Sequence, residues 1–329
     1  MNTTDPDSTK KTPPAADGQD VLVRVDDYTS LAGWSNVVEA AARARQCCEQ
    51  LEEGRVLYFD RLPYVLFKED KEFLLSQRQS GSRLHKNVSY RPAEDVLRGA
   101  AGGPQETARL HGIMRKYSEE VTRFMKQWLP PYAAEMALDY ASFRPEEEEG
   151  RDLPVHKRND LLHCDAFPTR PMNGHRILRC FTNINPTTPR VWHTTEGFSA
   201  LAEKYAATAG LAGFAAKGSA RSHPLVRSIK KAFGLKAVDH SAYDRFMLRF
   251  HDYLKENSDF QQSCPKIRLE FQPGWTWVCY TDSVPHAVLS GRYALEQTFI
   301  IPLQSLVTPD TAPIRVLERL ANKPLSRAA

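Results

Sequence analysis

One ten-residue segment constrains the fold more than any other part of the chain. Residues 176–185, RILRCFTNIN, alternate as a β-strand does. One face of this strand consists of Leu178, Cys180, Thr182 and Ile184. The other face mixes apolar and polar side chains, so neither face suits bulk solvent. Such a strand is typical of a barrel whose interior holds a polar site, and we predict that it lines one.

Several shorter strands are predicted around this segment. Residues 55–59 are rich in β-formers, and residues 266–272 alternate with Ile267, Leu269 and Phe271 inward. Pro273 and Gly274 favour a type II turn. The remaining strands are expected at 275–280 and 293–301. Strands joined by hairpins without a βαβ rhythm predict a mainly β chain with flanking helices, whose core is an antiparallel jelly roll or double-stranded β-helix.

Helices are predicted on both sides of these strands. Apolar residues recur at helical spacing in residues 35–53, 105–128 and 314–321, and in an insertion at about 196–262. The Pro130–Pro131 pair is expected to end the second helix. The acidic run at residues 146–149 is interpreted as a solvated loop or hairpin tip.

We interpret the chain as one domain with two tails. Residues 1–20 are polar and Pro-rich, which is typical of a disordered tail. The domain is expected to span 21–308, with N-terminal helices at 35–130 and the jelly-roll core at about 150–305. Residues 309–329 are expected to form a C-terminal tail.

Composition limits the classes of function. The formal net charge of +4 over 329 residues is too small to indicate a nucleic-acid partner. The first twenty residues lack the apolar centre of a signal peptide, and the chain has no run of 18 apolar residues. The six cysteines show no CxxC spacing, which favours reduced thiols. We therefore expect a cytoplasmic protein.

A candidate metal site is indicated by His163 and Asp165. Side chains two residues apart on a strand point to the same face, so an imidazole and a carboxylate can bind one cation. His286, in a later strand, is the expected third ligand, and His193 is its best rival. Two histidines and a carboxylate form the facial triad that holds non-haem iron(II) and leaves positions open.

Four arginines near these residues are candidates for binding anions, because a guanidinium bonds two carboxylate or phosphate oxygens at once. Arg292 follows Gly291 at the start of the last strand and is the first candidate for a carboxylate-bearing co-substrate. Arg179, on the same strand face as Asn183, is the second. Arg170 and Arg176 are candidates for an acidic substrate. The alternative for each is a surface position or a pair with a nearby acid.

The segments that carry these residues resemble the Kdo hydroxylase family. Kdo is 3-deoxy-D-manno-oct-2-ulosonic acid, the sugar that joins lipid A to the lipopolysaccharide core. The resemblance runs from about residue 50 to 305 and is strongest in HCDAFPTRP at 163–171 and GHRILRCFTNINP at 174–186. GRVLYF at 54–59 and HAVLSGRYALEQTF at 286–299 also resemble this family.

The resemblance implies an iron(II)- and 2-oxoglutarate-dependent dioxygenase that uses O₂ to hydroxylate Kdo at C3, in the lipopolysaccharide inner core or Kdo–lipid A. It implies iron binding by His163, Asp165 and His286, with no catalytic residue beyond the metal centre. Contacts to 2-oxoglutarate are expected from Arg292, Arg179 and Asn183. Contacts to the substrate are expected from Arg170 and Arg176.

Three other functions stay open at this point. The chain could be an oxygenase acting on a protein or another small molecule. It could be a non-catalytic jelly-roll module that binds acidic sugars, because this fold hosts many functions. A zinc hydrolase is the third alternative, although no general base is evident.

A basic amphipathic segment predicts contact with a membrane surface. Residues 217–236 contain six lysines and arginines and no acid, with Ile229 and Phe233 on an apolar helical face. Such a helix suits the surface of an anionic leaflet, where a lipid-anchored Kdo substrate would lie. We expect a peripheral position at the cytoplasmic face of the inner membrane. The alternative is that the stripe packs on the barrel.

Overall fold

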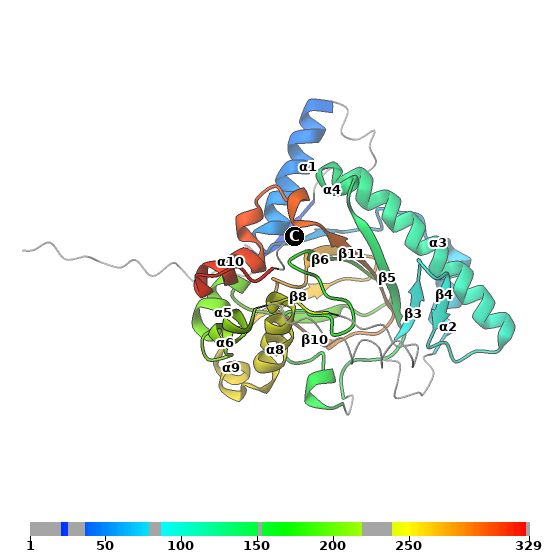
Figure 1. Ribbon diagram of the computed structural model, residues 1–329. Coiled ribbons are helices and arrows are strands. Elements are labelled where there is room, and N and C mark those ends of the chain that lie inside the picture. The colour runs from blue at the N-terminus through cyan, green and yellow to red at the C-terminus, as the bar shows by residue number, and fades with distance from the viewer. Residues whose placement is uncertain (1–20, 26–36, 79–86, 151–152, 219–238, 327–329) are drawn as a thin grey trace, which may run out of the picture.

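The computed structural model describes residues 21–25, 37–78, 87–150, 153–218 and 239–326. An eight-stranded sheet faces a three-stranded sheet, and the two enclose a roll flanked by helices (Figure 1). This arrangement confirms the predicted jelly roll. The tail at 1–20 and the basic residues 219–236 lie outside the described ranges.

The larger sheet contains the longest strands. Its order is β1 (Leu22–Arg24), β2 (Val56–Phe59), β9 (Thr276–Tyr280), β6 (Arg176–Asn183), β11 (Ala294–Ile301), β5 (Ala137–Arg144), β3 (Val88–Arg91) and β4 (Val96–Arg98). Only the β1–β2 pair is parallel among the described strands. The smaller sheet has the order β10 (His286–Ser290), β7 (Arg190–Thr194) and β8 (Ile267–Phe271).

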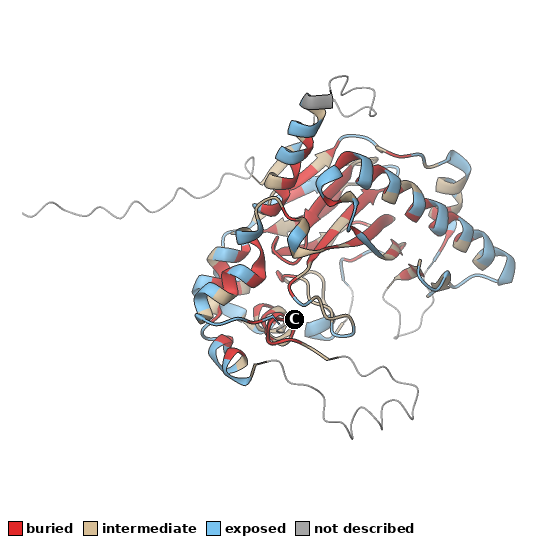
Figure 2. Ribbon diagram, turned by 45° about the horizontal axis from the view of Figure 1, so that its top comes forward, coloured by how far each residue is buried: buried red, intermediate tan, exposed pale blue. Residues whose placement is uncertain are grey.

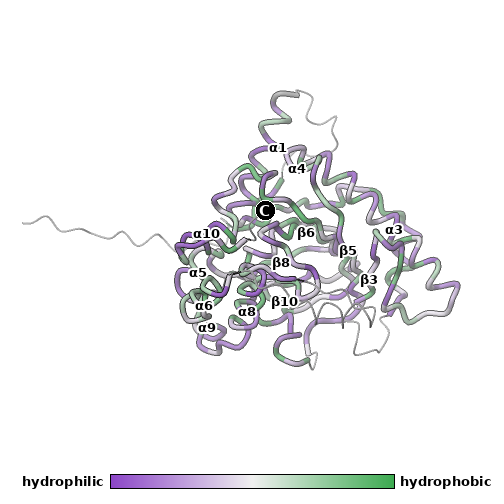
Figure 3. The backbone as a smooth tube through the Cα atoms, in the orientation of Figure 1, coloured by the Kyte–Doolittle hydropathy of each residue, from purple (hydrophilic) through white to green (hydrophobic). Residues whose placement is uncertain are grey.

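Helices surround the roll in two groups (Figure 1). The N-terminal group consists of α1 (Val37–Glu52), α2 (Lys68–Ser76), α3 (Pro104–Trp128) and α4 (Pro130–Ala133). The second group consists of α5 (Phe198–Tyr205), α6 (Leu211–Lys217), α8 (Ala242–Glu256), α9 (Ser258–Ser263) and the C-terminal α10 (Pro313–Ala321). Helices α5, α6, α8 and α9 lie between β7 and β8, in the predicted insertion. In Figure 3, hydrophobic and hydrophilic residues alternate along α3, as expected for a helix with one buried face.

Several local predictions are confirmed. Residues 176–183 of the predicted segment form β6, whose residues are all buried except the half-buried Arg179. Gly274 follows β8 with φ +82°, the left-handed conformation that a type II turn requires at this position. Pro130 and Pro131 follow the end of α3, but they also begin the short helix α4, because proline is tolerated in a first helical turn.

The sheet begins earlier in the chain than residue 150. Strand β5 pairs with β11 along most of its length and with β3 on its other side. Its sequence, ALDYASFR, has small or polar residues at half of its positions, so its alternation is weak. Strands β3 and β4 are only four and three residues long, too short for a periodic pattern.

The segment after residue 309 packs against the domain. Ile314 and Leu317 of α10 are buried, and Leu325 beyond the helix is completely buried. Figure 2 shows buried residues along the strands and exposed residues on the outer sides of the helices. Ile314 also fills the space beside Gly174, where a Cβ would approach its Cδ1 to 2.5 Å. The C-terminal residues through 326 are therefore part of the folded body.

The hydrophobic core has two parts. The larger lies between the eight-stranded sheet and the helices. The smaller lies inside the roll, where Trp277 stacks on Phe271 with ring centroids 3.9 Å apart and on Phe181 at 5.3 Å. Trp192 meets these rings edge-on. The aromatic group fills one part of the interior and leaves the rest to polar side chains.

Gly291 lies between β10 of the smaller sheet and β11 of the larger sheet, where the backbone approaches Arg190 closely. Its φ is +110°, and an added Cβ would lie 2.8 Å from the Cα of Arg190. We expect Gly291→Ala to lower the free energy of unfolding by about 1–2 kcal/mol from the backbone conformation and a further 1–3 kcal/mol from the clash. Gly274→Ala, at φ +82° with no atom within 4 Å, should show only the first loss. Urea unfolding of both variants measures the difference, and equal losses would contradict the close approach.

Candidate metal centre

The predicted metal ligands lie together inside the roll. One nitrogen or oxygen from each of His163, Asp165 and His286 falls within 4.8 Å of the others. His163 and His286 form an antiparallel bridge and exchange backbone hydrogen bonds of 3.2 and 3.0 Å. Asp165 is anchored by its own backbone N–H, which donates to Thr281. The backbone therefore sets the spacing of all three side chains.

Both imidazoles are oriented by backbone carbonyls. The Nδ1 of His163 lies 2.7 Å from the oxygen of Leu161, and the Nδ1 of His286 lies 3.0 Å from that of Val284. A proton on each Nδ1 donates to these carbonyls, which leaves each Nε2 with a free lone pair. The two Nε2 atoms lie 3.8 and 4.0 Å from the carboxylate oxygens of Asp165.

The protonation states suit a divalent cation. Burial lowers the pKa of His163 and of His286, so both are neutral at pH 7. Burial opposes ionisation of Asp165, but the charge of Arg179, with Nη2 3.2 Å from Oδ2, brings its pKa well below the usual value. Asp165 Oδ2 is buried and accepts no hydrogen bond from the described residues. Two neutral imidazoles and a carboxylate with a free acceptor fit iron(II).

His193, the rival third ligand, lies away from this centre. It is in β7 and pairs in register with Ala287 and Arg268. Its neighbours along the strand, Trp192 and Thr194, are buried, and His193 is half-buried on the opposite face. Trp192 stacks on the His286 ring with centroids 5.2 Å apart. The prediction of His286 over His193 agrees with this geometry.

The helical insertion reaches the metal centre, which the sequence patterns did not indicate. The Gln261 side chain accepts from the N–H of Leu162 and donates to its carbonyl. The ring of His251, in α8, meets that of His163 edge-on with centroids 4.8 Å apart. His251 Nδ1 also lies 2.9 Å from the carbonyl of Cys164. Helices α8 and α9 therefore support the segment that carries His163 and Asp165.

A series of alternating charges extends from the centre through the roll. Its members, each within 3.6 Å of the next, are Asp165, Arg179, Glu296, Arg144, Glu148 and Arg190. The expectation of a solvated loop at 146–149 is wrong for Glu148, whose side chain is only 3% exposed. Arginines from two different strands, β5 and β7, converge on this glutamate, and local sequence does not reveal such partners.

The charges of this series are not equally compensated. The pKa of Arg144 is raised, because Glu296 and Glu148 outweigh the effect of burial. Burial lowers the pKa of Arg190 to about 10, and Glu148 offsets this only in part. Arg190 Nη1 donates to the carbonyl of Gly291, whereas its Nε is buried without a partner among the described residues. Arg190 therefore carries the least compensated positive charge of the series.

The three residues that were expected to contact 2-oxoglutarate lie in different environments. Arg179 belongs to the charge series. Arg292 is half-buried and lies outside the charge series; its Nε donates to the carbonyl of Pro145, and its guanidinium covers the ring of Tyr293. The Asn183 side chain is occupied in the turn after β6, donating to two backbone carbonyls and accepting from the N–H of Asn185. Asn183 therefore has a structural role, contrary to expectation.

The two arginines that were expected to contact the substrate also lie in different environments. Arg170 is half-buried, pairs with Asp139, and lies over the ring of Phe167 at 4.0 Å. Arg176 has no exposed surface; it binds both oxygens of Asp282 and lies over Tyr280. A substrate contact from Arg176 is excluded, because strand alternation turns it to the outer face of the sheet.

Comparison with known proteins bears on this site. The model of the 3-deoxy-D-manno-oct-2-ulosonic acid (Kdo) hydroxylase family matches residues 34–324. No curated protein shows a significant match. Among solved structures, the chain is similar to the Kdo hydroxylase KdoO, a non-haem Fe(II) α-ketoglutarate-dependent dioxygenase, crystallised with α-ketoglutarate and Fe(III). Identity is 31% over 93% of this chain and 97% of that one, with a TM-score of 0.76.

The cobalt(II) complex of KdoO is equally similar, with 31% identity, coverage of 94% and 98% of the two chains, and a TM-score of 0.78. The family model and these structures extend across both sheets, the helical insertion and the bridge between His163 and His286. By fold and sequence, the chain belongs to the Kdo hydroxylase family.

Proposed function

We propose that the chain hydroxylates Kdo at C3 within a lipid or saccharide acceptor, as an iron(II)- and 2-oxoglutarate-dependent dioxygenase. The observation that carries this proposal is the arrangement of His163, Asp165 and His286 as two neutral imidazoles and one carboxylate around a common point. Membership of the Kdo hydroxylase family supports the choice of substrate. Iron(II), 2-oxoglutarate and O₂ are the required cofactor and co-substrates.

The bound iron supplies the oxidising chemistry, and the protein supplies orientation and a dry site. The carbonyls of Leu161 and Val284 fix which nitrogen of each imidazole is free. Trp192 covers the His286 ring and belongs to the aromatic group inside the roll, which excludes water from that side. Because the reaction is oxidative, no side chain is required as a general acid toward the substrate.

The metal assignment predicts a specific loss of cation binding. Asp165→Ala removes the only anionic ligand and should weaken cobalt(II) binding by at least about a hundredfold, with loss of 2-oxoglutarate turnover. His193→Ala is the matched control, because this histidine lies outside the cluster, and it should bind cobalt(II) normally. Visible absorption of the cobalt(II) complex measures both. Normal cobalt binding by Asp165→Ala would refute the assignment.

We assign the distal carboxylate of 2-oxoglutarate to Arg190, the last member of the charge series. Iron(II) adds two positive charges beside Asp165, and 2-oxoglutarate brings two negative ones. Arg190 has the least compensated charge and an unused Nε, so it is the group that gains most from a carboxylate. Arg179, next to Asp165, is placed to contact the metal-bound end of the co-substrate.

Substitutions of Arg190 and Arg292 test which of the two contacts the co-substrate. Arg190→Met should raise the KM for 2-oxoglutarate about tenfold or more, because a buried charge-assisted pair is lost. Arg292→Met, which removes a charge outside the charge series, should leave that KM within about a factor of two. Succinate release measures both. The reverse pattern would make Arg292 the co-substrate contact, and circular dichroism checks that Arg190→Met folds.

Contact with a membrane surface is a separate part of the proposal. No helix within the described ranges has the length and hydropathy needed to cross a bilayer. Residues 217–236 carry six basic residues, each contributing about 1 kcal/mol near an anionic surface. A segment of this kind would bring the enzyme to a lipid-anchored acceptor at the cytoplasmic face of the inner membrane.

Vesicle binding tests this contact. The protein should sediment with anionic vesicles at low salt and less so as salt rises, because surface attraction is screened. Replacing Lys230 and Lys231 by Glu should weaken sedimentation further, whereas the same exchange at Lys126, in α3, should not. If the unaltered protein ignores anionic vesicles at low salt, the membrane contact is refuted.

A further inference from the structure

We propose that Arg91 and Arg170, which share the ring of Tyr140, form a second anion-binding subsite outside the metal centre. This subsite would bind a carboxylate or phosphate attached to the acceptor but not to the sugar being oxidised. The inference rests on the proposed function for the identity of the acceptor. It implies that the preferred acceptor carries at least two separate anionic groups.

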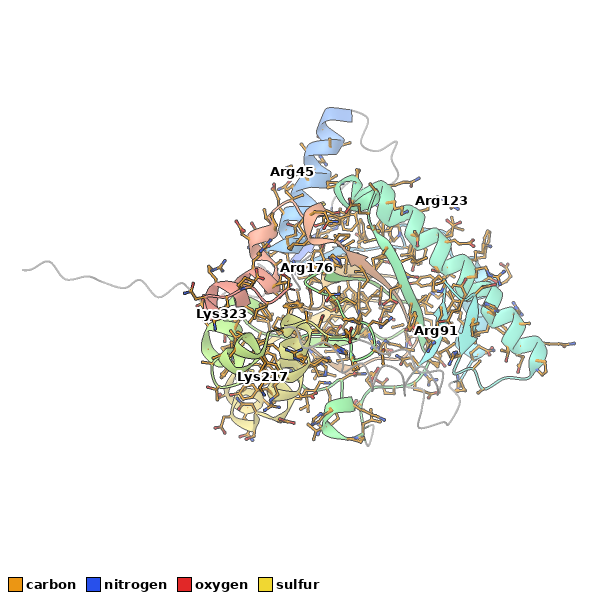
Figure 4. All side chains as sticks on the ribbon, viewed as in Figure 1. Arg45, Arg91, Arg123, Arg176, Lys217 and Lys323 are labelled. Carbon is orange, nitrogen blue, oxygen red and sulfur yellow. The ribbon has the colours of Figure 1, made fainter. Side chains whose placement is uncertain are left out.

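The sheet register places Arg91 on the inner face, the face turned toward the smaller sheet. Tyr90 pairs with Ala141, so Arg91 lies level with Tyr140. Tyr90 and Ala141 are buried toward the helices, and alternation turns Arg91 and Tyr140 the other way, as it does Arg144. Figure 4 labels Arg91, which lies in β3.

Cations and rings alternate from this position toward the metal. The guanidinium of Arg91 lies 4.9 Å from the Tyr140 ring, and that of Arg170 lies 4.2 Å from the same ring. Arg170 also covers Phe167 at 4.0 Å, and Arg179 lies 5.5 Å from Phe167. Rings that bind cations on their faces hold these guanidinium groups in place. The series connects the outer subsite to Arg179, the neighbour of Asp165.

The two outer arginines have unused hydrogen-bonding capacity. The Nε of Arg91 and the Nε of Arg170 are buried without partners among the described residues. The two side chains are nevertheless 26% and 28% exposed, so a ligand can reach them. Each Nε is itself buried, so an oxyanion would bind through the exposed part of the guanidinium, which can donate to two oxygens at once.

The local charge balance is positive. Asp139 neutralises Arg170. Among the described residues, Arg91 forms an ion pair with Glu94, whose carboxylate lies 3.8 Å away, too far for a hydrogen bond. The same glutamate is also 3.9 Å from Arg98, which lies on the same face of neighbouring β4. Two arginines therefore share one half-exposed acid, and the excess charge favours an anionic ligand.

A single anionic group cannot contact both Arg91 and Arg179. Two aromatic rings and a guanidinium separate Arg91 from Arg179, so a single sugar carboxylate contacts one end only. The second anion could be the carboxylate of a neighbouring acidic sugar or a phosphate on a lipid-linked sugar. Both are oxyanions that a guanidinium binds in the same way.

Three acceptors distinguish these sources. Free Kdo has one carboxylate, a Kdo–Kdo disaccharide adds a second, and a single Kdo on a phosphorylated glucosamine adds a phosphate alone. Calorimetry with the full chain and cobalt(II) measures the affinity for each acceptor. Turnover with iron(II) then gives KM and kcat. We expect Arg91→Met to weaken binding of one or both two-anion acceptors about tenfold, with kcat unchanged. Affinity for free Kdo should not change.

Two further variants serve as controls. Arg123→Met removes an exposed arginine on α3, on the helical side of the sheet, and should change none of the affinities. Arg91→Lys keeps the charge and should recover part of the lost affinity. Melting temperatures show whether each variant folds. The acceptor that loses affinity in Arg91→Met identifies the anion.

Two outcomes would overturn the subsite. One is an equal loss for free Kdo and for the larger acceptors, which would place Arg91 on the reacting sugar or in the fold. The other is no loss for any of them. Titration with inorganic phosphate separates the subsite from the proposed function. If the unaltered protein binds phosphate and Arg91→Met does not, while no Kdo acceptor binds, the anion subsite stands and the proposed function fails.

Discussion

The bridge between His163 and His286 is the contact on which the metal centre depends. The two residues exchange both backbone hydrogen bonds, which aligns the segment before Asp165 with β10. Because side chains alternate along extended chain, a shift by one residue would turn His163 to the opposite face. The insertion between β7 and β8 protects this alignment, since Gln261 binds both backbone groups of Leu162. A helical segment remote in sequence is therefore part of the metal centre.

The proximity of His163 and Asp165 was predictable from the sequence, because the two are only two residues apart. In the structure this segment is extended chain with an isolated bridge at His163 rather than a regular strand. The strand parity of β6 likewise placed Arg179 inside the roll. His193 and His286 were harder to separate, because each lies in a strand of the smaller sheet. Only the register of β7 shows that Trp192, and not His193, faces the His286 ring.

The charge series was not predictable, because its members meet only in three dimensions. Glu148 follows Arg144 by only four residues, but Arg190 comes from β7, and no local spacing relates it to the other two. An acidic run such as 146–149 usually lies in solvent, and it was assigned there. Burying Glu148 is tolerable because two arginines surround it, whereas an isolated buried carboxylate would be expensive. Long-range charge compensation thus overrides the local preference.

Two arginines of β6 show how the same residue type serves different purposes. Arg176 and Arg179 are three residues apart and so lie on opposite faces of the strand. Arg176 has a dedicated partner in Asp282 and no exposed surface, so its charge is fully used by the fold. Arg179 divides its charge between Asp165 and Glu296. A guanidinium shared in this way can change partners when a cation and a dianion arrive, because neither of its present pairs is exclusive. Arg176, on the outer face of β6, therefore contributes to stability, whereas Arg179, on the inner face, can change partners when ligands bind.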